Sequence, residues 1–200
     1  MRWLSPDDLS QIYGQPAPAA IRKVADRMTD AYRAHLDRAR FCILSTVGPE
    51  GTDASPRGDD GPVVLELDPR TLALPDWRGN DRIDSLKNIA RDDRISLMFL
   101  IRGSGNVIRV NGRARITDDD TLRARFARHD KLPRTVIVAR IGEIYFQCAR
   151  AVLRAGLWTG ADDSTGLPTP GQILASMTAD EVGGAAYDQA WPERAAQTMW

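Results

Sequence analysis

Cysteine and histidine are scarce in this sequence, which has only two of each among 200 residues. Cys42 and Cys148 both fall in predicted strands, far apart in the chain, and we expect each to be a buried thiol that packs as a small apolar group. His35 and His129 fall in predicted helices, without Cys, His or carboxylate companions at ligand spacing. A metal site is therefore not expected.

Net charge is also absent, because 27 acidic residues balance 27 basic ones. Arginine provides most of the basic residues and is spread along the chain, which argues against a nucleic-acid partner. No apolar segment approaches the about 20 residues that span a membrane. The first residues run into an acidic segment and do not resemble a signal peptide. We expect a cytoplasmic protein with no nucleic-acid or membrane partner.

Glycine-rich nucleotide motifs are missing as well. No Gly-x-x-x-x-Gly-Lys-[Ser/Thr] occurs, and Gly103-x-Gly105 is followed by Ile108, where a dinucleotide fingerprint needs a third glycine. A predicted strand follows this pair instead of a helix. These absences exclude Rossmann and P-loop sites, and the chain length fits one domain with helical additions.

The clearest pattern lies in residues 79–117. Apolar positions at helical spacing predict a helix over 83–91, followed by a buried strand over 95–101 and an alternating strand over 107–117. The helix start carries Asn80 and Arg82, with Ser85 one turn in, and such a start suits an anion such as phosphate. A solvated helix end is the alternative that spacing alone leaves open.

The rest of the sequence predicts further short elements. Helices are expected from Pro6 to about Gly14 and over 19–38, 121–129, 149–156, 170–177 and 187–199; strands are expected over 41–47, 52–55, 63–67, 71–74 and 135–148. The last strand is either continuous or broken by a bulge near Gly142-Glu143. Pro56 restricts residues 55–62 to a sheet edge or to a loop, which either carries binding groups or simply connects two strands. Strands at hairpin spacing with short helices indicate a small β-barrel.

The order of these pieces resembles the pyridoxamine 5′-phosphate oxidase-related family of FMN-binding split barrels, and within it a branch of uncharacterised FMN-dependent enzymes. The resemblance covers residues 36–160 and rests on seven pieces in the right order. They are residues 41–46, 55–59, 74–82, 84–89, 94–99, 109–114, and 147–151 with Leu157-Trp158.

The resemblance implies a mainly β protein with helices (α+β), an FMN-binding split β-barrel. We expect an N-terminal helical extension (1–38), the barrel domain (39–160) and a C-terminal loop and helical tail (161–200). The tail is interrupted by glycine and proline and is predicted to be an appendage. Its Trp191 and Trp200 can pack over the cofactor mouth or on a partner subunit. The resemblance also implies a homodimer with FMN at the subunit interface.

Nine cofactor-binding residues follow from the resemblance, in three groups: the phosphate segment, the loop that borders the flavin ring, and the segment after the late strand. These groups are Asn80, Arg82, Ser85 and the nearby Asn88; Arg57, Gly58 and Asp59; and Arg150 and Arg154. The oxidase proper has an Arg-Lys pair where this chain has Asp84-Ser85. The oxidase's substrate-phosphate clamp and late Arg-x-His motif are not found either, which argues against pyridoxamine phosphate as the substrate.

The function expected from the resemblance is that of an FMN-dependent oxidoreductase acting on an unknown small molecule. The flavin would carry the redox chemistry, and no residue is assigned as general acid or base. Two alternatives stay open: a flavin-binding carrier or sensor without turnover, and a related split barrel that uses haem or a deazaflavin. Haem needs an axial ligand, and both histidines lie in predicted helices outside the barrel hairpins, which argues against it.

Overall fold

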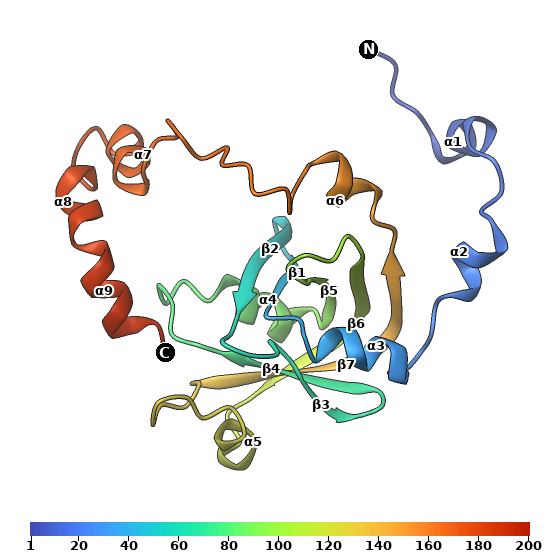
Figure 1. Cartoon of the computed structure of the whole chain (residues 1–200), viewed down its shortest axis with the longest axis horizontal. Coiled ribbons are helices and arrows are strands. Elements are labelled where there is room, and N and C mark those ends of the chain that lie inside the picture. Colours follow the sequence, from blue (N-terminus) through green and yellow to red (C-terminus); the bar gives the residue numbers. More distant parts are fainter.

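The computed structural model describes residues 1–200, which form one seven-stranded antiparallel sheet with short helices around it (Figure 1). The strands are β1 (Phe41–Gly48), β2 (Gly51–Gly58), β3 (Leu65–Asp68), β4 (Thr71–Asp76), β5 (Arg94–Leu100), β6 (Val107–Thr117) and β7 (Thr135–Gln147). The helices are α1 (Pro6–Ile12), α2 (Pro18–Arg22), α3 (Asp30–Leu36), α4 (Asp84–Arg91), α5 (Asp120–Ala124), α6 (Arg150–Arg154), α7 (Pro170–Met177), α8 (Gly184–Gln189) and α9 (Trp191–Thr198).

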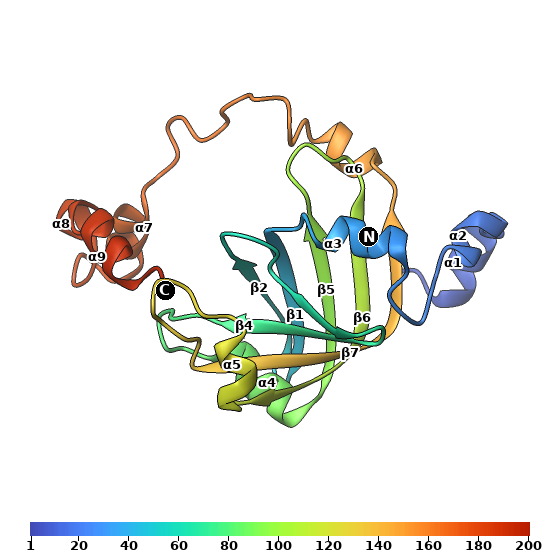
Figure 2. The same ribbon diagram turned by 60° about the horizontal axis from the view of Figure 1, so that its bottom comes forward.

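The sheet has the strand order β2-β1-β5-β6-β7-β4-β3 and is strongly curved. Figure 2 shows β4 and β7 running across the lower ends of β1, β5 and β6. The long strand β7 is continuous but bulged, because the register steps from Asn111 opposite Glu143 to Gly112 opposite Ile141. The bulge leaves Gly142 unpaired and bends the strand. This architecture confirms the expected α+β split barrel.

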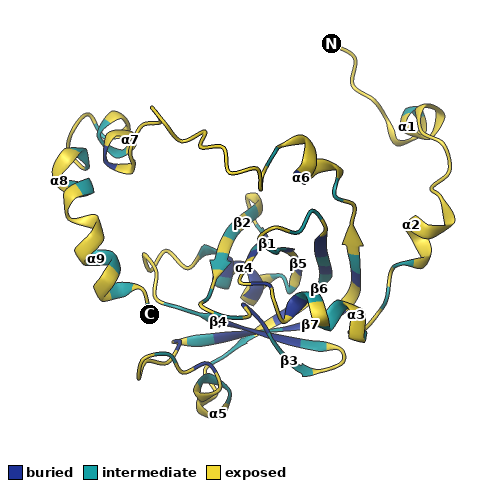
Figure 3. Cartoon of the chain, viewed as in Figure 1, coloured by how far each residue is buried: buried dark blue, intermediate teal, exposed yellow.

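The core lies inside the curved sheet. Successive side chains of a strand point to opposite faces, so every second side chain points into this core. Cys42 and Leu44 of β1, Phe99 of β5 and Ile108 of β6 have no exposed surface. Ile89 of α4 also belongs to this cluster and anchors the helix on the barrel. Figure 3 shows buried residues concentrated in the sheet, whereas α1, α2 and α7–α9 are mostly exposed.

The single helix predicted over 19–38 is wrong, because the chain forms α2 and α3 with an extended segment between them. Ala25 makes an antiparallel bridge with Ile144 through hydrogen bonds of 2.9 and 2.8 Å. Thr29 then starts α3 by accepting a hydrogen bond from the backbone N–H of Tyr32. A contact with a strand more than 100 residues later therefore overrides the local helical pattern.

Three smaller predictions also need correction. The helix expected over 121–129 ends at Ala124, because Arg128 and Lys131 close a tight turn that holds His129 at positive φ. The helix expected over 187–199 is divided between α8 and α9. Cys148 is exposed, since it follows the end of β7.

The remaining strand predictions agree with the structure within a few residues. The segment with Pro56 continues β2 as far as Gly58, at one edge of the sheet, where proline's missing N–H costs no ladder hydrogen bond. Cys42 is buried as expected, and burial raises the pKa of its thiol to about 12. None of the helices has the length and apolarity needed to cross a membrane.

Candidate functional site

A cleft of about 1060 Å³ lies between β2, the end of β4 and the start of α4. We call it the β2–α4 cleft, and its size is at the upper end of the range for small-molecule sites. Its lining comes from segments far apart in the sequence. They are residues 53–60, Val63, residues 75–86, Arg134-Thr135 and Met199-Trp200.

The backbone before α4 shapes one side of this cleft. Asp81 and Ile83 have positive φ angles of 57° and 51°, and such a conformation is unfavourable for a β-branched residue such as Ile83. Ile83 is the N-cap position of α4 and offers no side-chain acceptor. The first N–H groups of α4 are therefore left without a side-chain cap. Backbone strain of this kind is often found at binding sites.

Arg57 and Asp76 form a mostly buried ion pair within the cleft. The Arg57 Nη1 donates to Asp76 Oδ1 over 2.5 Å, and the two side chains are 19% and 16% exposed. The Arg57 Nε is buried and has no hydrogen-bond partner. Since an unpaired buried N–H group is unfavourable, this donor is the best indication that a ligand acceptor completes the site.

Asp59 fixes the wall of the cleft. Its Oδ2 accepts from Trp77 Nε1 at 2.9 Å, its Oδ1 accepts from Arg128 Nε at 3.2 Å, and its side chain is 1% exposed. Both carboxylate oxygens therefore hold donors from the protein itself. Gly58, the last residue of β2, lines the cleft beside it.

The expected phosphate segment also lies in the cleft, but its donors contact groups of the chain itself. The Asn80 Oδ1 accepts a hydrogen bond from the backbone N–H of Arg82 at 3.1 Å. The guanidinium of Arg82 is paired with Asp84, and Ser85 Oγ donates to Asp53 Oδ2 at 3.0 Å. An anionic ligand here would have to take the place of these carboxylates.

Three of the nine expected residues do not line the cleft. Asn88 is buried beneath it and donates to Thr46 Oγ1 at 3.1 Å. A Cβ atom on Gly48 would lie 2.6 Å from Asn88 Oδ1, so the two residues pack closely and hold α4 on β1. Arg150 and Arg154 are on α6, which Figure 2 shows at the opposite end of the barrel from α4.

The site also includes residues that were not predicted from the sequence to bind the cofactor. Asp53 and Asp76 are the carboxylates that pair with Ser85 and Arg57, and Trp77 borders the cleft. Asp76 and Trp77 lie within residues 74–82, one of the seven pieces that carry the resemblance, so the sequence could have indicated that they belong to the site. Asp53 gave no such signal, because its contact with Ser85 depends on how α4 packs against β2.

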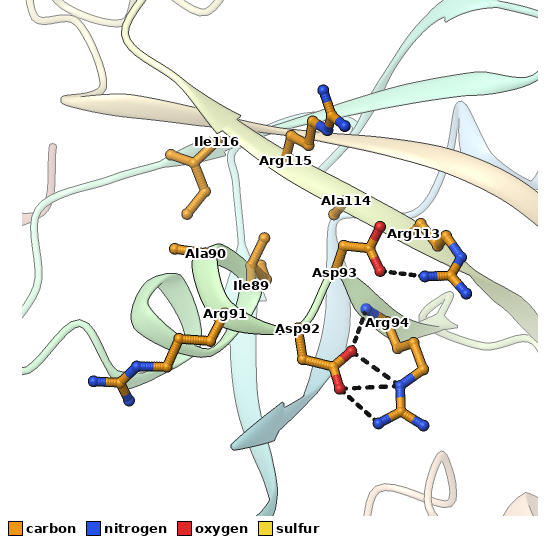
Figure 4. Close-up of a pocket in the computed structure, with 10 residues that line it drawn as sticks. All are labelled: Ile89, Ala90, Arg91, Asp92, Asp93, Arg94, Arg113, Ala114, Arg115 and Ile116. Atoms are coloured by element: carbon orange, nitrogen blue, oxygen red, sulfur yellow. Dashed lines mark hydrogen bonds and ion pairs between the residues drawn. The ribbon is translucent and has the colours of Figure 1, made fainter. Parts of the chain in front are cut away.

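A second hollow of about 830 Å³ lies on the surface where α4 leads into β5 (Figure 4). Asp92 accepts hydrogen bonds from the side chain and backbone of Arg94, which lower the pKa of its carboxyl to about 2. Asp93 is paired with Arg113. Both carboxylates are thus neutralised by neighbours, and no group of three or more potential metal ligands occurs in the structure.

Comparison with known proteins places these features in a family. Residues 28–148 match the family model for pyridoxamine 5′-phosphate oxidase. A histidine-to-alanine variant of HupZ from Group A Streptococcus is 16% identical, with a TM-score of 0.50 over 60% of this chain and 100% of that chain. This likeness supports the fold alone.

Two other solved structures align less closely. General Stress Protein 26 from Bacillus anthracis is 19% identical, with a TM-score of 0.42 over 57% of this chain and 88% of that one. A FAD-binding protein from Mesorhizobium loti is 13% identical, with a TM-score of 0.42 over 62% and 94%. A search of curated proteins found no match. Because the family model covers more than half of the sequence and all seven strands, the chain belongs to the pyridoxamine 5′-phosphate oxidase family.

Proposed function

We propose that the β2–α4 cleft binds FMN and that the protein is an FMN-dependent oxidoreductase acting on a small molecule. Membership of the family suggests a flavin cofactor. The observation that carries the proposal is the buried Arg57 Nε, which lacks an acceptor inside a cleft lined by six of the nine expected FMN residues. When bound, the flavin would supply hydride or electron transfer.

The residues of the cleft fit a ligand with a polar ring and a phosphate. Arg57 would hold an acceptor atom of the ring, since it has an unpaired N–H and lines the part of the cleft that the resemblance assigns to the flavin ring. Arg82 and the uncapped N–H groups of α4 would hold the phosphate, which a helix N-terminus favours. Arg78 lines the same cleft without a carboxylate partner and adds positive charge.

Arg82→Ala should weaken FMN binding about ten- to a hundredfold and leave riboflavin binding unchanged, because riboflavin has no phosphate. A charged hydrogen bond contributes roughly 1.5–3 kcal/mol, which corresponds to that range of affinity. We expect the lower end, since Arg82 must first leave Asp84. Flavin fluorescence quenching measures both affinities.

Arg82→Lys is the matched control for this experiment. It should recover part of the FMN affinity, because lysine keeps the charge but not the planar fork of donors. Equal small losses for FMN and riboflavin in Arg82→Ala would remove Arg82 from the phosphate site and leave Arg78, which also lines the cleft, to supply the charge.

We also propose a homodimer, with FMN at the subunit interface. The outer face of β1 and β5 carries apolar side chains in register, with Phe41 opposite Leu100 and Ile43 opposite Met98. Phe41 and Met98 are 41% and 37% exposed. Contiguous apolar surface of this kind commonly marks an interface.

Light scattering at micromolar concentration should therefore give twice the 22.1 kDa mass of the chain. Met98→Glu should shift the protein toward the monomer, since it places a charge in the centre of the apolar face. A wild-type monomer that still binds FMN would contradict the dimer proposal.

A flavin-binding carrier or sensor is the second candidate, and one observation favours it. The lining of the cleft contains no His, Cys or Tyr, and most of its carboxylates are paired with arginines. The protein thus offers few groups for acid–base chemistry, although hydride transfer does not require one. Anaerobic addition of nicotinamide nucleotides distinguishes the two functions, since bleaching of bound flavin indicates a reductase. The same lining contains no histidine, and Met199 is its only side chain of a type that ligates haem.

A further inference from the structure

The C-terminal tail leaves the barrel after α6 and arcs back toward it, as Figures 1 and 2 show. Its last residues, Met199 and Trp200, line the β2–α4 cleft. Its helices hold one another together. Asp188 of α8 accepts hydrogen bonds from the backbone N–H of Gly171 at 2.9 Å and from the hydroxyl of Thr169 at 2.5 Å. The tail is therefore a small helical unit whose last residues line the β2–α4 cleft.

The contact at the cleft is aromatic. The ring of Trp200 packs edge-to-face on Trp77, with 5.1 Å between ring centroids and 81° between planes, and lies 6.3 Å from the ring of His129. Trp77 itself is fixed, because its Nε1 donates to the buried Asp59. Trp200 is thus half-buried on a rigid surface, whereas Trp191 of the same tail is 56% exposed.

This arrangement would allow Trp200 to cover a ligand in the β2–α4 cleft. An edge-to-face pair stabilises weakly, so the contact can open without disturbing the barrel. The linker from α6 to α7 is long and has no regular secondary structure, and Gly160 and Gly166 adopt positive φ within it. A closed tryptophan beside Trp77 would exclude water from a ligand in the cleft.

We propose that Trp200 closes over the flavin in the β2–α4 cleft and slows its release. This inference rests on the proposed FMN site and adds a residue from outside the barrel to it. Trp200 would act by covering the flavin and not through chemistry. Loss of the indole should then accelerate the release of FMN while the barrel stays folded.

The test is the rate of FMN release, measured by stopped-flow fluorescence after mixing loaded protein with excess of a competing flavin. Trp200→Ala should release FMN about tenfold faster, and Trp200→Phe should stay within about threefold of the wild type. Trp191→Ala is the matched control, with the same change on the same tail, and should release FMN at the wild-type rate. Thermal unfolding of the ligand-free variants should be unchanged.

Three other outcomes would overturn the proposal that Trp200 covers the flavin. Equal release rates in Trp200→Ala and the wild type would overturn the cover, and so would the same acceleration in Trp191→Ala. If the wild-type chain binds no FMN at all, the proposed function itself fails and the cover fails with it. The wild-type binding curve therefore separates the two failures.

Discussion

Gly112→Ala should lower the free energy of unfolding by about 3 kcal/mol, the upper part of the range for overpacking. A Cβ atom at this position would lie 2.0 Å from the carbonyl oxygen of Arg140 and 3.3 Å from the backbone nitrogen of Gly142. Both atoms belong to the backbone of β7, beside the bulge, and cannot rotate away. The strands β6 and β7 would have to separate where they join the two halves of the barrel.

Urea unfolding followed by tryptophan fluorescence measures this effect. Gly14→Ala is the control, because a Cβ atom there meets nothing within 4 Å. Its free energy of unfolding should stay within about 0.5 kcal/mol of the wild type, as for most surface substitutions. If both variants unfold at the same urea concentration, the bulge tolerates a side chain and the described packing of β6 on β7 is wrong.

Arg57→Met should weaken FMN and riboflavin alike, by about ten- to a hundredfold. Methionine keeps the apolar stem but removes the guanidinium, and with it a charged hydrogen bond worth roughly 1.5–3 kcal/mol. Both flavins should respond because Arg57 is assigned to the ring, which they share. This distinguishes Arg57 from Arg82, whose loss should affect FMN alone.

Arg57→Met also leaves Asp76 without its partner, so a loss of stability accompanies the loss of binding. The double variant Arg57→Met/Asp76→Asn is therefore the control. Neutralising the carboxylate should restore most of the stability, since an unpaired buried charge is the main cost of breaking such a pair. Flavin affinity should remain low. Recovery of affinity in the double variant would show that Arg57 acts only by neutralising Asp76.

Much of the barrel was predictable because strand alternation is a local signal. The alternation over 107–117 gave β6, and the apolar run over 95–101 gave β5. The helix expected over 19–38 failed because the bridge between Ala25 and Ile144 is long-range and leaves no local mark. Tight turns such as the one at His129 also depend on backbone geometry that residue type does not specify.

The candidate site was predictable to a lesser extent. The resemblance, which rests on the order of the pieces along the chain, assigned residues 57–59 and the start of α4 to the same cofactor. The structure places both segments in one cleft. The partners within the cleft could not be read from the sequence. Ser85 contacts Asp53 across 32 positions, and Arg57 contacts Asp76 across 19. The first pair depends on how α4 packs against β2, and the second on how the curved sheet brings β2 and β4 together.

The central claim is that the β2–α4 cleft holds FMN, and one titration tests it most directly. FMN fluorescence is followed as wild-type protein and the Arg57→Met/Asp76→Asn variant are added, after circular dichroism has shown that both are folded. We predict saturable quenching at one FMN per chain for the wild type and affinity at least tenfold lower for the variant. Equal affinity for both proteins, or no quenching by the wild type, would contradict the claim.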